Sequence, residues 1–217
     1  MNRLSFRETI ALCTASILLV AANGVGFIAY SWTETFGFIS GGACVWLAVR
    51  QHLLTWPLGL LNNALFFALF LESRLFADMG LQLVYFALGV YGWILWRSRR
   101  GADPLAISRM PQWEWIFVLT SIPILTIGLR SVLVAANGAA PLLDASTTSL
   151  SLAGQYLLGR KRIENWGFWI AADLIYVPLY ASRALYLTAV LYAIFLAMCI
   201  VGLRDWRRIR DMQHEGV

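Results

Sequence analysis

Residues 164–180 read Glu-Asn-Trp-Gly-Phe-Trp-Ile-Ala-Ala-Asp-Leu-Ile-Tyr-Val-Pro-Leu-Tyr, an apolar stretch with one carboxylate, Asp173, near its middle. At 100° per residue, four of its side chains fall within about 80° of one another on one helical face: Trp166, Trp169, Asp173 and Tyr176. An ionisable group in the middle of a membrane span costs about 2.5–3.5 kcal/mol, so it normally faces a bundle interior or a water-filled cavity. Two indoles, a carboxylate and a phenol favour a flat polar or cationic ring compound as ligand. The alternative is that the indoles form an interfacial belt and that Asp173 pairs within the bundle.

The composition indicates a membrane protein. Of 217 residues, 59% are hydrophobic and 13% are charged, whereas soluble domains carry about 25% charged residues. Since each span needs about 20 apolar residues, eight spans use about 160 and leave only short loops, with no separate soluble domain. The 3 cysteines and 2 histidines are scattered, without disulfide or metal-ligand spacing. We therefore expect no cofactor and no metal site.

Eight apolar runs predict an all-α integral membrane protein with eight transmembrane helices, at residues 9–30, 32–49, 54–72, 75–96, 113–135, 143–159, 164–180 and 185–203. If the N-terminus is cytoplasmic, only Arg74, Arg130 and Arg183 of the 17 basic residues fall outside. The inside residues are Arg3, Arg7, Arg50, Arg97, Arg99, Arg100, Arg109, Arg160, Lys161, Arg162, Arg204, Arg207, Arg208 and Arg210. This bias predicts that both termini are cytoplasmic. It also accounts for the net charge of +5 without a nucleic-acid partner.

The chain resembles itself at an offset of 110 residues. The matched pairs include Trp56 with Trp166, Trp96 with Trp206, Arg50 with Arg160, Gly92 with Gly202, Asn63 with Asp173, and Phe66 with Tyr176. Because a single span separates two copies of three spans, both copies enter the membrane in the same orientation, as in the parallel repeats of some transporters. The predicted organisation is an extra N-terminal helix (1–31), a first repeat (32–96), a basic loop and linker helix (97–142), a second repeat (143–206) and a cytoplasmic tail (207–217).

Polar side chains gather on single faces of the repeat helices. One face of the sixth span, about 100° wide, carries Asp144, Thr147, Thr148, Ser151 and Gln155. The bulkier polar groups fit a packing network and a substrate site equally well; they are Asn62, Gln82, Gln155 and Asp173. The first copy has Gly37 and Gly59 where the second has Thr147 and Trp169, so the second half carries more of the recognition chemistry.

Five segments resemble the bacterial nicotinamide riboside transporters of the PnuC type. They are Leu54-Thr-Trp-Pro-Leu-Gly-Leu-Leu-Asn62, Arg74-Leu-Phe-Ala-Asp-Met-Gly-Leu-Gln82, Tyr91-Gly-Trp-Ile-Leu-Trp96, Glu164-Asn-Trp-Gly-Phe-Trp169 and Leu185-Tyr-Leu-Thr-Ala-Val-Leu-Tyr-Ala-Ile-Phe195. The similarity covers about residues 32–206. Relatives that carry thiamine or riboflavin share a similar frame, so the resemblance leaves the vitamin open.

The resemblance implies a 3+1+3 core built like the SWEET sugar transporters, an additional N-terminal helix, and a homotrimer in the bacterial inner membrane. It implies facilitated diffusion of nicotinamide riboside for NAD synthesis, with a cytoplasmic kinase that phosphorylates the substrate and prevents its exit. The substrate-binding residues that it implies are Asn62, Gln82, Trp93, Thr147, Gln155, Trp166, Trp169, Asp173 and Tyr176. The shared helical face described above also supports Trp169, Asp173 and Tyr176.

The sequence also bears on other classes of function. A thiamine or riboflavin carrier of the same family is the main alternative. An intramembrane enzyme would need a nucleophile–base pair or a metal cluster, but there is no Gly-x-Ser-x-Gly, no His-Glu-x-x-His and no histidine in any predicted span. A channel or a receptor is also possible, although a repeat with a polar interior requires neither. We expect a transporter and not an enzyme, with alternating access around a fixed site.

Overall fold

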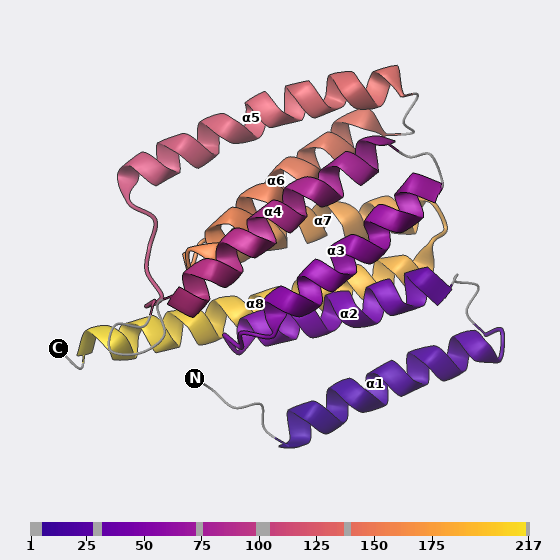
Figure 1. Cartoon of the computed structure of the whole chain (residues 1–217), viewed down its shortest axis with the longest axis horizontal. Coiled ribbons are helices and arrows are strands. Elements are labelled where there is room, and N and C mark those ends of the chain that lie inside the picture. Colours follow the sequence, from indigo (N-terminus) through magenta and orange to yellow (C-terminus); the bar gives the residue numbers. More distant parts are fainter. Residues whose placement is uncertain (1–5, 28–31, 73–75, 99–104, 137–139, 216–217) are drawn as a thin grey trace. The chain divides into compact units, whose positions relative to one another are not determined.

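The computed structural model describes the chain except for residues 1–5, 28–31, 73–75, 99–104, 137–139 and 216–217. The described residues form eight α-helices (Figure 1). They are α1 (Phe6–Gly24), α2 (Trp32–Val49), α3 (Thr55–Glu72), α4 (Phe76–Ser98), α5 (Gln112–Ala135), α6 (Pro141–Gly159), α7 (Asn165–Ser182) and α8 (Tyr186–Glu215). The chain is therefore all-α, as predicted.

The N-terminal helix is shorter than its apolar run. The sequence predicts a helix to Tyr30, but α1 ends at Gly24. Gly26 has a left-handed backbone (φ 73°), and the amide of Phe27 donates to the carbonyl of Ala22 at 2.9 Å. This arrangement ends helices commonly, and glycine adopts it without steric cost. The rest of the predicted run lies outside the described residues.

The C-terminal helix is longer than its apolar run. The sequence predicts a tail at 207–217, yet α8 continues to Glu215. The segment after Leu203 has no glycine or proline before Gly216. Its arginine, methionine and glutamine residues are good helix formers. The helix therefore continues past the apolar segment from which it was predicted.

The chain divides into two compact units, residues 1–90 and 91–217. In the first unit α1 packs on α2, and α2 packs on α3. In the second unit α5 packs on α6, α6 on α7, and α7 on α8 (Figure 1). The end of α4 from Tyr91 belongs to the second unit, where the Trp96 indole donates to the carbonyl of Gly159 at 3.0 Å. The core of that unit includes the buried Trp166 and Trp206.

Two turns have the same backbone structure at an offset of 110 residues. Gln51, after α2, and Lys161, after α6, are both left-handed, with φ values of 53° and 51°. In each turn the next amide donates to the carbonyl five residues earlier, at 2.8 Å for His52 and 2.9 Å for Arg162. Non-glycine residues seldom adopt this conformation, because it costs about 1–2 kcal/mol. The local structure of the α2–α3 and α6–α7 turns therefore repeats where the sequence does.

Three helical segments among the described residues are long and apolar enough to cross a membrane. They are Met79–Ser98, Gln112–Ala135 and Thr188–Gln213, and two shorter apolar segments are Cys13–Gly24 and Thr35–Val49. Helices α6 and α7, which carry the polar face residues, are not in this set. The number of eight spans stays a prediction.

Candidate functional site

The two indoles of the predicted face of α7 have different surroundings. Trp166 is buried, at 2% exposure, and meets Trp206 edge-on with ring centroids 5.4 Å apart. An added Cβ at Gly202 of α8 would lie 2.7 Å from three atoms of the Trp166 ring, so the missing side chain makes room for this indole. Trp166 is thus a packing residue of the second unit in this conformation.

Trp169 is half-buried and lies against α6. An added Cβ at Gly154 would lie 2.9 Å from its ring nitrogen. The glycine therefore lets the indole approach the α6 backbone and fixes its position from one side. Of the two indoles, Trp169 is the one with surface left to contact a ligand.

Asp173 lies one helical turn beyond Trp169 and is 5% exposed. Its carboxylate accepts a hydrogen bond from the Cys199 thiol of α8 at 3.7 Å. Among the described residues no cation lies within ion-pair distance of it. A thiol is a weak donor, so most of the hydrogen-bonding capacity of this carboxylate remains for a ligand or water.

Tyr176 joins the polar residues of α6 to a group of tyrosines. Its hydroxyl lies near the side chain of Thr147, which is fully buried and donates to the carbonyls of Leu143 and Asp144. Its ring lies 4.6 Å from that of Tyr192 and 5.8 Å from that of Tyr180, and the last two rings stack at 5.1 Å. Tyr180 and Tyr192 were not among the site residues predicted from the sequence. A signal for Tyr180 was present, because it follows Tyr176 by four residues and so lies on the same side of α7.

The remaining predicted residues fall in both units. Asn62, in the first unit, donates to the Gly37 carbonyl at 3.2 Å and to the Ser40 hydroxyl at 2.6 Å, which joins α3 to α2. Gln82 in the first unit is half-buried, as are Trp93 and Gln155 in the second. The structure thus brings Thr147 to Tyr176 and places Trp169, Asp173 and Tyr176 along one helix. The use of all nine residues as a substrate site stays a prediction.

The loop before α5 docks on the α6–α7 turn through polar contacts. Ser108 donates from its amide to the Lys161 carbonyl at 3.1 Å, and Arg162 donates to the Ser108 hydroxyl at 2.6 Å. Glu114 of α5, which is fully buried, lies 2.9 Å from Arg160 Nε and 2.7 Å from Arg162 Nε. The second pair is within ion-pair distance but is not aligned as a hydrogen bond. These contacts hold the start of α5 on the α6–α7 turn.

The position of Lys161 in the α6–α7 turn lowers the pKa of its ammonium group. Its ammonium lies 4.7 Å from the centroid of the Trp96 ring. Burial lowers the pKa of Lys161 to about 8, since desolvation disfavours the charged form.

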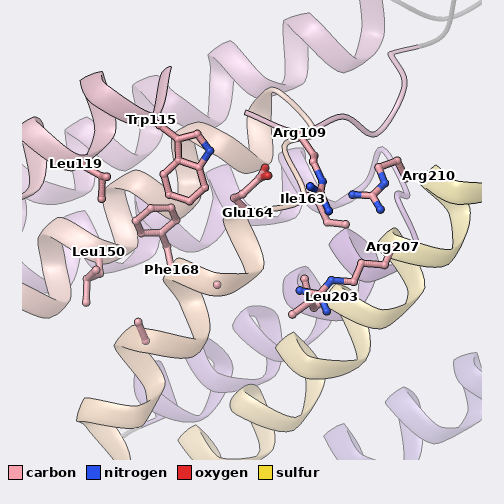
Figure 2. Close-up of a pocket in the computed structure, with 12 residues that line it drawn as sticks. Arg109, Trp115, Leu119, Leu150, Ile163, Glu164, Phe168, Leu203, Arg207 and Arg210 are labelled. Carbon is pink, nitrogen blue, oxygen red and sulfur yellow. The ribbon is translucent and has the colours of Figure 1, made fainter. Parts of the chain in front are cut away.

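Figure 2 shows a pocket of about 400 Å³ beside α7. By helix geometry the pocket lies on the opposite side of α7 from the predicted face. Glu164, Gly167, Phe168 and Ala171 line it, and their mean direction is about 170° from that of the Trp166–Tyr176 face. The pocket is also lined by Trp115, Leu119, Leu150, Arg109, Arg207 and Arg210. We call it the basic pocket. It contains none of the nine predicted substrate residues, and no pattern in the sequence predicted it.

Known proteins that this chain is similar to are described as transporters. A family model described as nicotinamide mononucleotide transporter matches residues 31–208. The chain is 28% identical over 218 residues to the nicotinamide riboside transporter PnuC of Escherichia coli (strain K12), covering 88% of this chain and 91% of that protein. It is 27% identical over 180 residues to the riboflavin/roseoflavin transporter RibM of Streptomyces davaonensis, covering 81% and 84%.

A solved structure has the same fold. The crystal structure of the vitamin B3 transporter PnuC matches with a TM-score of 0.74 and 19% sequence identity. The match covers 98% of this chain and 95% of that chain. The helical arrangement is therefore shared along almost the whole chain.

Proposed function

Since the chain belongs to the nicotinamide mononucleotide transporter family, we propose that it carries nicotinamide riboside across the bacterial inner membrane by facilitated diffusion. The relatives named above are transporters and not enzymes. The substrate is proposed from the PnuC relatives and from the residues of α7. Phosphorylation by a cytoplasmic kinase would keep the net flow inward and supply NAD synthesis.

The single observation that carries the substrate proposal is the pairing of a half-buried indole with a buried carboxylate on α7. Trp169 offers a ring face, and Asp173 lies one turn away, where the Cys199 thiol is its only hydrogen-bond donor among the residues that the structure describes. Nicotinamide riboside has a cationic aromatic ring and ribose hydroxyls. An indole attracts a cationic ring. A carboxylate in apolar surroundings attracts the positive charge of the ring and accepts hydrogen bonds from the ribose hydroxyls.

The proposed architecture is a parallel 3+1+3 repeat with an extra N-terminal helix. The two left-handed turns at Gln51 and Lys161 support it. Ring pairs also correspond at the same offset, Phe66 with Phe70 and Tyr176 with Tyr180, each with centroids 5.8 Å apart. Parallel repeats suit alternating access, in which two bundles rock around a site near the membrane midplane.

The two repeats differ in polarity at one contact. In the first, the Phe66 ring lies directly against Gly37. In the second, 110 residues later, the Tyr176 hydroxyl lies near the Thr147 hydroxyl. A glycine and a phenyl ring in the first repeat therefore correspond to two hydroxyl side chains in the second, so the second repeat is the more polar one. This asymmetry fits a ligand with a ring at one end and a sugar at the other.

Transport in proteoliposomes tests the proposal. Labelled nicotinamide riboside should enter without any ion gradient and stop at equal concentrations, while an enclosed kinase with ATP should raise the total uptake further. Trp169→Ala and Asp173→Asn should weaken uptake, whereas Leu174→Ala, at an exposed position of the same helix, should not. No uptake by the wild-type protein would refute the function. Equal uptake by all three variants would refute the site.

Riboflavin is the second candidate, because RibM is a relative of similar identity. Competition by nicotinamide riboside, riboflavin and thiamine against one labelled ligand separates the candidates. The homotrimer is a further proposal, which light scattering of the purified protein checks. Cysteine labelling of each terminus in intact cells checks the predicted cytoplasmic location.

A further inference from the structure

The basic pocket has an apolar half and a cationic half (Figure 2). On one side Trp115 of α5 and Phe168 of α7 lie with ring centroids 6.5 Å apart, and Leu119 and Leu150 extend this apolar wall. Arginine side chains lie on the other side, with Glu164 between the two halves. A cavity of about 400 Å³ falls within the range that holds small molecules. The division into two halves suits an amphipathic molecule.

The cationic half has positive charge that the protein does not neutralise. Among the described residues no carboxylate pairs with the guanidinium of Arg109 or of Arg207. Arg210 pairs with Asp211 at 2.6 Å. The Glu164 carboxylate, which would repel an anion, accepts a hydrogen bond from the Met110 amide at 3.1 Å. Two guanidiniums therefore remain for an anionic ligand.

The rim of the pocket is held in place by the backbone. Arg109 lies between Ser108, which pairs with the α6–α7 turn, and Met110, which is 6% exposed. The guanidinium of Arg162 also donates to the Arg109 carbonyl at 3.1 Å. Arg207 projects from the continuous helix α8. Both cations are thus carried by ordered segments that the packing positions.

We propose that the basic pocket binds an anionic phospholipid of the cytoplasmic leaflet. Its phosphate would lie between Arg109 and Arg207, and the upper part of one acyl chain would lie along Trp115, Phe168 and Leu119. Basic pockets between membrane helices on the cytoplasmic side attract such headgroups, and the apolar wall matches the chain. The proposal rests on the proposed cytoplasmic orientation of the α6–α7 turn, but not on the identity of the transported vitamin.

Lipid titration of the purified full-length protein in a neutral detergent tests this site. Phosphatidylglycerol should raise the unfolding temperature in a saturable manner, and phosphatidylcholine should not. Arg109→Gln with Arg207→Gln should raise the apparent lipid dissociation constant about 30-fold, since each arginine near a headgroup contributes about 1 kcal/mol, or about fivefold. The matched control is Arg204→Gln with Arg208→Gln, which removes the same charge from exposed positions of α8 outside the pocket. It should titrate like the wild type.

A second variant tests the apolar half without a change of charge. Ala171→Phe fills the pocket and should also weaken phosphatidylglycerol binding, as read by lipid adducts in native mass spectrometry. Equal loss in both arginine double variants would overturn the proposal in favour of diffuse surface attraction. An equal shift with glycerol 3-phosphate or inorganic phosphate would overturn it in favour of a soluble anion. Because these measurements involve no transport, they separate a failure here from a failure of the proposed function.

Discussion

Gly154→Ala should weaken substrate binding by displacing Trp169. The added Cβ would lie 2.9 Å, 3.0 Å and 3.1 Å from three atoms of the indole, whereas ordinary contacts are about 3.5–4.0 Å. The ring must therefore retreat by about 0.5–1 Å. A gap of that size forfeits about a quarter to a half of a contact energy. Applied to stacking of about 1–3 kcal/mol per ring, the loss is about 0.3–1.5 kcal/mol, a rise in Kd of about 2- to 12-fold.

The assay is equilibrium binding of nicotinamide riboside, with the unfolding temperature measured on the same samples. Gly202→Ala is the contrasting variant, because its Cβ would press on the buried Trp166 from 2.7 Å. Overpacking costs about 1–3 kcal/mol, so this variant should lose stability more than affinity. Gly128→Ala is the neutral control, since nothing lies within 4 Å of its added Cβ. An unchanged Kd for Gly154→Ala, together with a large loss for Trp169→Ala, would refute the displacement argument.

Three further variants test the polar contacts, each by thermal unfolding. Glu114→Ala removes the buried partner of two arginines and should cost about 2–4 kcal/mol, somewhat less than in a fully sealed pair because both guanidiniums still reach water; an unchanged unfolding temperature would contradict this. Burial lowers the pKa of Lys161 from 10.5 to about 8, so between these values the unfolded state holds more protons and stability should rise with pH. Below pH 8 both states hold the proton, so the buried charge destabilises the fold fully and adds no pH dependence. Lys161→Met should abolish that rise, and a rise of the same size in the variant would rule out Lys161 as its source. Cys199→Ala removes the thiol that donates to Asp173 and should cost about 1–3 kcal/mol, whereas Cys199→Ser keeps a donor; equal losses in the two would count against the hydrogen bond.

Much of the helical arrangement was predictable because apolar runs and glycine positions are local features. The range of α2 agrees with its prediction at both ends, Trp32 and Val49. The end of α8 was not predictable from hydropathy, because the backbone stays helical through Arg204 and beyond without apolar side chains. The beginning of a polar segment marks the end of a hydrophobic run and not the end of a helix.

For the candidate site, the sequence predicted only which side chains share one face of α7. Periodicity placed Trp166 and Trp169 on one side of α7, but it does not say which indole a neighbouring helix covers. That depends on Gly202, which lies far along the chain on α8 and makes room for Trp166. The basic pocket depends on a loop that folds back onto the α6–α7 turn through Ser108. Contacts of this kind between distant segments leave no periodic signal in a single sequence.

The uninterrupted course of α8 has a practical use. Its 30 residues span about 45 Å at 1.5 Å per residue, whereas the hydrocarbon layer is about 30 Å thick. A stiff rod of that length transmits any tilt inside the bilayer to its polar end. A fluorophore on Gln213→Cys, in a background without the exposed Cys13, would therefore report the proposed rocking of the bundles from a place that touches neither the candidate site nor the basic pocket.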